Sequence, residues 1–200
     1  MGKKDWLKMD VLEGEKKVLL HACCAPCSGA IIECMLNVGL TPVVFYSNSN
    51  IYPSEEYIIR RDECRRWAET NGLEFVEDDY DHGTWNTAVA SGLETEPERG
   101  PRCLQCFRYR LRRAAQYAHE HGYHILTTTL ASSRWKSLEQ IDKAGFEACE
   151  SFDDVRWWAQ NWRKGGLQQR RSEIIREQNF YNQLYCGCEF SRNVRADGDC

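Results

Sequence analysis

Seven of the eleven cysteines in this 200-residue chain stand in three tight groups. The groups are Cys23, Cys24 and Cys27, then Cys103 and Cys106, then Cys186 and Cys188. Grouped thiols bind metal ions or iron–sulfur clusters, or cycle between dithiol and disulfide. The first two groups supply five sulfurs, more than one tetrahedral zinc ion binds, whereas an iron–sulfur cluster takes four thiolates. The sequence therefore predicts a cluster with a second metal or a redox pair beside it, with a structural zinc site as the alternative.

The third group differs from the others because a single residue, Gly187, separates its two cysteines. A disulfide across so short a spacing is strained, and strained disulfides are readily reduced. We therefore interpret Cys186 and Cys188 as a redox-active pair that relays electrons. The alternative is that one of the two is a metal ligand.

The remaining cysteines and the histidine beside the first group carry no such pattern. Cys34, Cys64 and Cys149 fall in helical patterns and are predicted to be small core residues. Cys200 is expected to be inert. His21 ends an apolar run next to the first group, and we expect a hydrogen-bonded structural residue rather than a ligand.

The sequence shows no apolar run long enough to cross a bilayer or to form a signal-peptide core. We therefore expect a cytoplasmic chain without a membrane partner, in a compartment that disfavours structural disulfides. The formal net charge of −4 gives no general attraction to nucleic acid. Basic residues nevertheless gather at 60–66, 108–113, 163–164 and 170–176, as solvated helix faces or as sites for an acidic partner.

Short apolar runs alternate with helical patterns along most of the chain. Strands are predicted at 17–21, 41–46, 73–76 and 124–129, and the longest helix at 101–120. This alternation predicts a three-layer, Rossmann-like α/β fold with a parallel sheet. The loops after the carboxyl ends of parallel strands form the ligand crevice, and Cys23 to Cys27 occupy the first such loop. Cys27 and the Cys103–Cys106 pair begin helices, whose N-termini lower thiol pKa values.

The last quarter of the sequence departs from this alternation. We expect an α/β domain over residues 1–150 that carries the main cysteine site. Residues 151–200 would then form a C-terminal helical appendage that closes over the site with the Cys186–Cys188 motif. The alternative is one single domain overall.

Five motifs together resemble the QueH-type epoxyqueuosine reductases. They are His21–Cys27, Cys103–Cys106 followed by Arg110 and Leu111, Thr127–Leu130, Asn161–Gly166 and Tyr185–Cys188. The resemblance implies reduction of epoxyqueuosine to queuosine at the wobble position of tRNA, the last step of queuosine synthesis. It also implies a [4Fe-4S] cluster, an external electron donor and a fold similar to the adenine-nucleotide α-hydrolases.

The resemblance assigns roles residue by residue. Cys23, Cys24, Cys103 and Cys106 would hold the cluster and its adjoining iron, and Cys27 would be a ligand of that second iron. Cys186 and Cys188 match the dithiol–disulfide pair. Arg110, Arg163 and Lys164 are expected to contact tRNA, the last two because a basic pair before two glycines lets charge and backbone approach a phosphate together.

Two other classes of function stay open at the level of sequence. One is a zinc-stabilised RNA-binding module without catalysis. The other is a cluster-dependent tRNA thiolase. The first cysteine loop lacks a Gly-Gly-x-Asp-Ser phosphate cradle, which argues against activation by a nucleotide.

Overall fold

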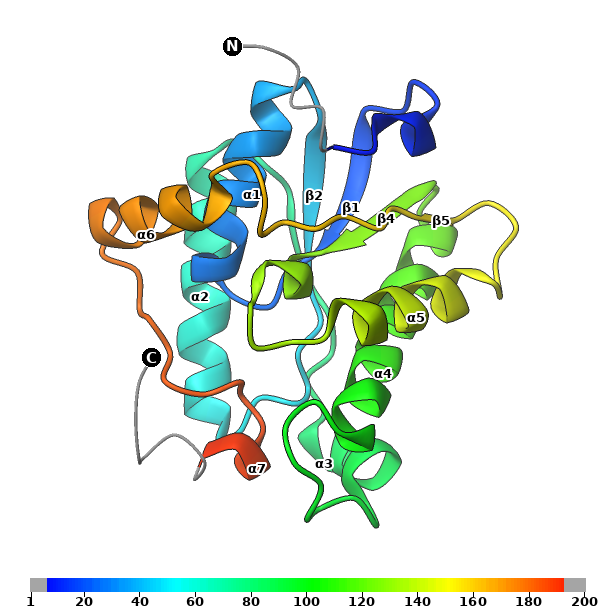
Figure 1. The fold of residues 1–200 in the computed structure, drawn as a ribbon, viewed down its shortest axis with the longest axis vertical. Helices are drawn as coiled ribbons and strands as arrows, with labels where there is room; N and C mark the ends of the chain where they lie inside the picture. Colours follow the sequence, from blue (N-terminus) through cyan, green and yellow to red (C-terminus); the bar gives the residue numbers. More distant parts are fainter. Residues whose placement is uncertain (1–6, 193–200) are drawn as a thin grey trace.

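A five-stranded parallel sheet forms the centre of the computed structural model, which describes residues 7–192 (Figure 1). Its strand order is β3-β2-β1-β4-β5, with all neighbours parallel. The strands are β1 (Lys17–His21), β2 (Thr41–Tyr46), β3 (Phe75–Glu77), β4 (Ile125–Thr128) and β5 (Arg156–Trp157). Cys200 lies outside the described residues. The predicted parallel α/β sheet is confirmed.

Helices cover both faces of the sheet and complete the three layers (Figure 1). The α-helices are α1 (Ala25–Asn37), α2 (Ser54–Thr70), α3 (His82–Trp85), α4 (Pro101–Glu120), α5 (Leu138–Cys149), α6 (Leu167–Glu177) and α7 (Glu189–Arg192). Helix α1 packs against α2 and α6, whereas α4 packs against α5. Two 3-10 helices, η1 (Met9–Leu12) and η3 (Thr129–Ser132), and one π-helical turn, η2 (Asn86–Ala90), complete the helical elements of the described residues. No helix among the described residues combines the length and the apolar character needed to cross a bilayer.

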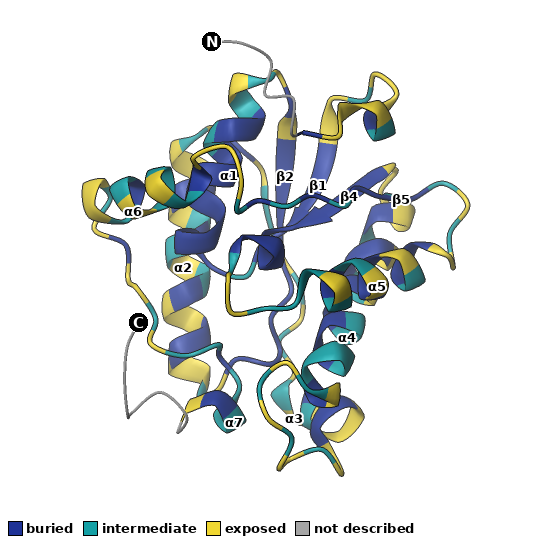
Figure 2. Cartoon of the chain, viewed as in Figure 1, coloured by how far each residue is buried: buried dark blue, intermediate teal, exposed yellow. Residues whose placement is uncertain are grey.

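The two central strands are buried on both faces, as strands between two helical layers must be (Figure 2). Every residue of β1 and β2 after the first is buried, and Leu19 pairs in register with Val43. Cys34, Cys64 and Cys149 belong to the same core, as predicted.

The alternation of strands and helices extends one strand further than the sequence predicts. Strand β5 follows residue 150 and pairs with β4 through Ile125 and Leu126. Two residues are too few to show the alternation of a strand, so the hydrophobic pattern of the sequence does not predict β5. Trp157 of β5 lies so close to α5 that a Cβ on Gly145 would approach its ring to 2.2 Å. The sheet thus continues into the segment expected to be an appendage, and a boundary at residue 150 stays a prediction.

Candidate thiol-lined active site

The first cysteine group lies at the carboxyl end of β1, where the chain turns into α1. Cys24 is the N-cap residue of α1 in an extended conformation, and Pro26 occupies its first turn, where a missing N–H costs nothing. This tight turn brings the three sulfurs of Cys23, Cys24 and Cys27 within 4.8 Å of one another. We call these residues the sulfur triad. Within the part of the chain that the structure describes, it is the group whose ligand atoms lie close enough for one metal ion.

Buried polar contacts fix the strand end that carries the triad. The ring of His21 hydrogen-bonds the Thr128 hydroxyl at 2.7 Å and the Ser47 carbonyl at 3.1 Å. Burial, with a smaller effect from Arg110, holds the pKa of His21 well below its usual range. The backbone N–H of Cys23 donates to the Thr129 hydroxyl at 3.0 Å. His21 is therefore a structural residue, as expected.

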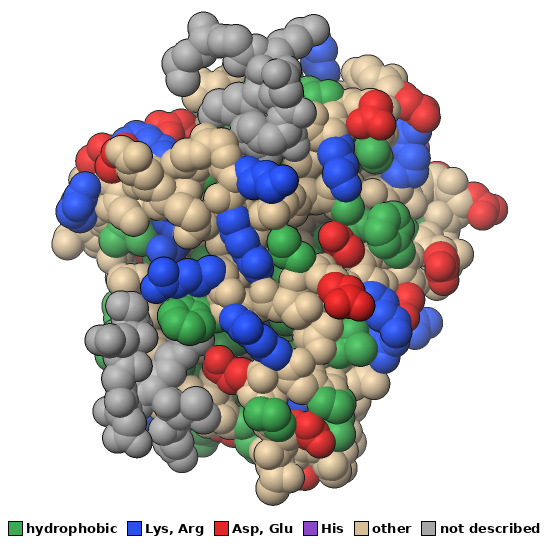
Figure 3. Space-filling model, in the orientation of Figure 1, with side chains coloured by type: hydrophobic (Ala, Val, Ile, Leu, Met, Phe, Trp, Pro, Cys, Tyr) green, Lys and Arg blue, Asp and Glu red, His purple; other side chains and the backbone are tan. Residues whose placement is uncertain are grey.

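The triad opens into a cavity of about 340 Å³. Five cationic side chains line this cavity and no acidic one does; the cations are Arg60, Arg110, Arg134, Lys136 and Arg171. Figure 3 shows Lys and Arg side chains running across the middle of the face on which η3 lies in front. A cavity with this charge balance attracts anionic ligands and stabilises thiolates.

The second and third cysteine groups lie together beside the triad. Cys106 and Cys188 pack in one small apolar cluster with Trp85. Cys186 lines the triad's cavity and also a smaller cavity beside it, which Cys103 lines as well. The sulfurs thus converge on one end of the sheet from β1, from α4 and from the C-terminal segment.

The pKa values of Cys27, Cys103 and Cys106 do not follow from their positions at helix N-termini. The pKa of Cys27 is lowered well below its usual range, as expected, but mainly because the Cys23 and Cys24 thiols hydrogen-bond its sulfur. The prediction is wrong for Cys103 and Cys106, because burial raises their pKa values to about 11 and about 12. A bound metal ion deprotonates such thiols on coordination.

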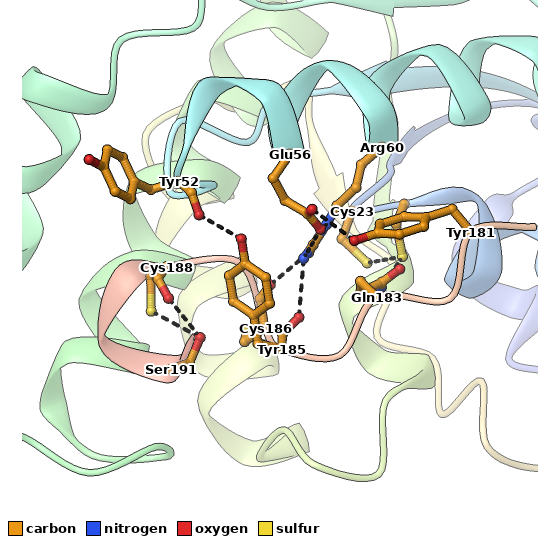
Figure 4. Close-up of polar contacts among 11 residues, drawn as sticks. Cys23, Tyr52, Glu56, Arg60, Tyr181, Gln183, Tyr185, Cys186, Cys188 and Ser191 are labelled. Atoms are coloured by element: carbon orange, nitrogen blue, oxygen red, sulfur yellow. Dashed lines mark hydrogen bonds and ion pairs between the residues drawn. The ribbon is translucent and has the colours of Figure 1, made fainter. Parts of the chain in front are cut away.

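Residues 178–188, which we call the strap, run from the end of α6 past α2 to the Cys186–Cys188 motif (Figure 1 and Figure 4). Arg60 of α2 donates to the backbone carbonyls of Tyr185 at 3.3 Å and Cys186 at 3.2 Å. Its guanidinium pairs with Glu56 at 2.6 Å, and Glu56 in turn accepts from the Tyr181 hydroxyl at 2.9 Å. A buried ion pair therefore holds the strap onto α2.

The strap also touches the triad directly. The side-chain amide of Gln183 donates to the Cys24 sulfur at 2.9 Å (Figure 4). Gly187 adopts φ +130, and a Cβ there would meet Ile51, Arg60 and Asn50 at 3.1 to 3.2 Å. Only glycine fits this close approach without strain, which explains the residue between the two cysteines.

The three predicted tRNA-contacting residues lie in different environments. Arg110 is buried in the cavity wall, where its guanidinium donates to the Ser47 carbonyl at 3.2 Å and to the Asn48 side chain. Arg163 lies partly buried and donates to backbone carbonyls of the segment before α5, whereas Lys164 is exposed. Neither Arg163 nor Lys164 is among the residues that line the triad's cavity.

Most of the other arginines in the basic groups are paired with acids on the surface. Ion pairs join Arg61 and Arg65 to Glu77, Arg108 to Glu147, Arg113 to Asp78, and Arg170 to Glu33. For these residues, the interpretation as solvated helix faces holds. In the sequence, Arg60 stood out only as a member of the basic group at 60–66, and no pattern singled out Gln183.

A parallel α/β sheet whose carboxyl end carries clustered thiols in a cationic cavity defines a class of enzyme: one that performs thiol- or metal-dependent chemistry on an anionic substrate. Comparison with known proteins gives the particular family. The family model described as "Epoxyqueuosine reductase QueH" matches residues 18–194.

Curated relatives carry the same name. The chain is 47% identical to "Epoxyqueuosine reductase QueH" of Histophilus somni, over 92% of this chain and 75% of the relative. It is 46% identical to that of Haemophilus influenzae over the same shares, and 43% identical to that of Acinetobacter baylyi over 94% and 86%. The chain belongs to the QueH family of epoxyqueuosine reductases and is an oxidoreductase.

Proposed function

We propose that this protein reduces epoxyqueuosine to queuosine at the wobble position of tRNA, the last step of queuosine biosynthesis. The reaction removes the epoxide oxygen as water and leaves an alkene, which requires two electrons and two protons. The observation that carries the proposal is the sulfur triad in a cavity whose charged side chains are all cations. Such a cavity admits an anionic nucleotide and places it against thiols suited to redox chemistry.

The donor set of the triad fits a metal centre. Tetrahedral metal–sulfur bonds of about 2.3 Å place neighbouring sulfurs about 3.8 Å apart. The sulfurs of Cys23 and Cys24 are separated by 3.8 Å. Three thiols leave one position open for a substrate oxygen, as catalytic metal sites do.

We assign the metal ligands as follows. Cys23, Cys24, Cys103 and Cys106 together hold a [4Fe-4S] cluster and its adjoining mononuclear iron, and Cys27 is a further ligand of that iron. Each thiolate of a cluster binds a different iron, which accords with Cys103 and Cys106 standing apart from the triad. When bound, these groups supply the electrons and a Lewis acid for the epoxide oxygen.

The protein's own residues bind and orient the substrate and deliver electrons. Cys186 and Cys188 cycle between dithiol and disulfide, fed by an external donor, and return electrons to the cavity that Cys186 lines. Arg110 contacts tRNA from the cavity wall. Lys164 contacts a phosphate from the surface, and Arg163 adds its charge beside it. The reaction takes place in the cytoplasm, where the thiols stay reduced.

Incubating the anaerobically purified protein with epoxyqueuosine-containing tRNA and a reductant tests the proposal. Mass analysis of the digested nucleosides should show queuosine, and metal analysis should show iron. A thiolated nucleoside would instead support a tRNA thiolase. A colourless protein that contains zinc but no iron would support the zinc-stabilised RNA-binding module.

A further inference from the structure

The loop between η3 and α5 is held by an unusual set of hydrogen bonds. Five consecutive backbone carbonyls, those of residues 132–136, each accept a hydrogen bond from a side chain. Arg99 donates to Arg134 and Trp135, Arg163 donates to Ser133 and Lys136, and Gln168 donates to Ser132. We call residues 132–136 the braced loop.

The donors of the braced loop come from two separate parts of the chain. Arg99 precedes α4, Arg163 precedes α6, and Gln168 lies in its first turn. Two guanidinium groups beneath one loop repel each other, and burial together with Arg99 lowers the pKa of Arg163. Surface loops are ordinarily mobile, and charge-assisted hydrogen bonds on both sides of this loop fix its shape. The arrangement suits a loop whose side chains must be presented in a set geometry.

The side chains that the loop presents face the cavity and its rim. Arg134, Trp135 and Lys136 all line the triad's cavity. Trp135 is 43% exposed, whereas the other five described tryptophans are 7% exposed or less. The Arg134 guanidinium lies 5.0 Å from the Trp135 ring centroid. An exposed aromatic ring beside cations is the combination that single-stranded nucleic acid recognises.

The cavity is deep enough to distinguish two positions along a bound nucleic-acid strand, one at its floor and one at its rim. Cys24 and Cys27 are 1% and 7% exposed, so the thiols lie at the floor, below the exposed Trp135. At about 340 Å³ the cavity is near the lower end of ligand-site volumes, which run from about 300 to 1,000 Å³. It therefore takes one nucleoside, and the next nucleotide of the strand stays at the rim.

We propose that the braced loop is a nucleotide-binding platform on which Trp135 stacks against the base adjacent to the nucleoside in the cavity. Arg134, with Arg171 of α6, contacts the phosphates that join the two nucleotides. The inference rests on the proposed function for the identity of the strand, an unpaired RNA loop. Within the platform, Arg99 and Arg163 are positioning residues, since they hold the backbone of the loop.

Binding of an unmodified anticodon stem-loop RNA tests the platform without requiring reduction. Base–aromatic stacking contributes about 1–3 kcal/mol, so Trp135→Ala should weaken the Kd about 5- to 150-fold. Trp135→Phe should retain most of the affinity but lose the quenching of tryptophan emission that RNA causes in the natural protein. Phe146→Ala removes another exposed aromatic side chain, 53% exposed on α5, and should bind like the natural protein.

The charged part of the platform has its own measurement. Arg134→Gln should lower the slope of log affinity against log salt by about 0.7, the value for one phosphate contact on a single strand. Arg112→Gln, an exposed arginine on α4 outside the cavity lining, should leave this slope unchanged.

The failures of the two proposals are distinguishable. Equal Kd values for Trp135→Ala and Phe146→Ala, or no binding of the stem-loop by the natural protein at low salt, would overturn the platform even if queuosine is formed. Binding that depends on Trp135, without formation of queuosine, would retain the platform and reject the reductase. The thermal midpoint of each variant confirms that the fold is intact.

Discussion

The ion pair between Arg60 and Glu56 offers the sharpest test of how the strap is held. Arg60→Met keeps the length of the side chain and removes its charge. It deprives the Tyr185 and Cys186 carbonyls of a donor and leaves the Glu56 carboxylate without its cation, with only the Tyr181 hydroxyl still donating to it. The side chains of Arg60 and Glu56 are only 2% and 9% exposed, so the pair counts as buried. Removing one partner of a buried pair costs about 3–5 kcal/mol.

That cost is expected to fall first on the strap, because the strap is the segment that Arg60 joins to α2. If the whole cost destabilises only the closed position of the strap, the population of molecules with an open strap rises by about a hundredfold to a few thousandfold. Cys188 reports the opening, since its thiol donates to the Ser191 hydroxyl at 3.6 Å and packs beside Cys106. Alkylation of the reduced, metal-stripped protein, resolved by peptide mass spectrometry, gives the rate for this one thiol.

Arg61→Met on the same helix is the matched control. Its pairs with Asp62 and Glu77 lie at the surface, where an ion pair contributes about 0–1 kcal/mol. Alkylation of Cys188 should therefore stay within a few-fold of the natural rate. Equal rates in the two variants would refute the argument that the buried pair holds the strap. A double variant that also replaces Glu56 with Leu should recover part of the loss, since no buried carboxylate is left alone.

Three further predictions concern the cluster, the redox pair and the core, and a fourth concerns RNA. Cys103→Ala should abolish cluster incorporation, and full iron content in this variant would place the cluster elsewhere. Cys188→Ser should keep the iron but fail in multiple turnovers, whereas loss of iron would make this residue a metal ligand. Gly145→Ala should destabilise the protein by about 1–3 kcal/mol because its Cβ would lie 2.2 Å from the Trp157 ring, which a thermal midpoint would show. Lys164→Gln should lower the salt slope of tRNA binding by about 0.7–0.9, and an unchanged slope would assign this lysine to the solvated surface.

The sequence predicted the elements that show either a clear apolar run or apolar residues at helical spacing. The strands at 17–21 and 41–46 are apolar runs bounded by polar turns, and both occur with these bounds. Strand β5 escaped prediction because its two residues show no alternation, and pairing with β4 alone makes it a strand. A helix at about residues 101–120 was predicted because its apolar residues repeat at helical spacing, and α4 spans Pro101–Glu120.

The site was predictable only where residues close in sequence stay close in space. Cys23, Cys24 and Cys27 share one turn, so spacing alone indicated a metal-binding group. The contact of Gln183 with Cys24 spans 159 residues and the contact of Arg60 with Cys186 spans 126. No local pattern encodes such contacts. The acidity of Cys103 and Cys106 was mispredicted for a related reason, since burial by distant segments outweighs the helix terminus.

The position of the strap explains how the last quarter of the chain supplies both a cavity wall and the proposed redox pair. A crevice at the carboxyl end of a parallel sheet is open to water, and reductive chemistry requires a site from which water is largely excluded. Asn182, Gln183 and Tyr185 close one side of the cavity, and the same segment brings Cys186 to its lining. Arg60 on α2 holds the backbone of both Tyr185, which lines the cavity, and Cys186, a member of the proposed redox pair. Loosening that anchor should therefore affect Cys186 and the cavity together.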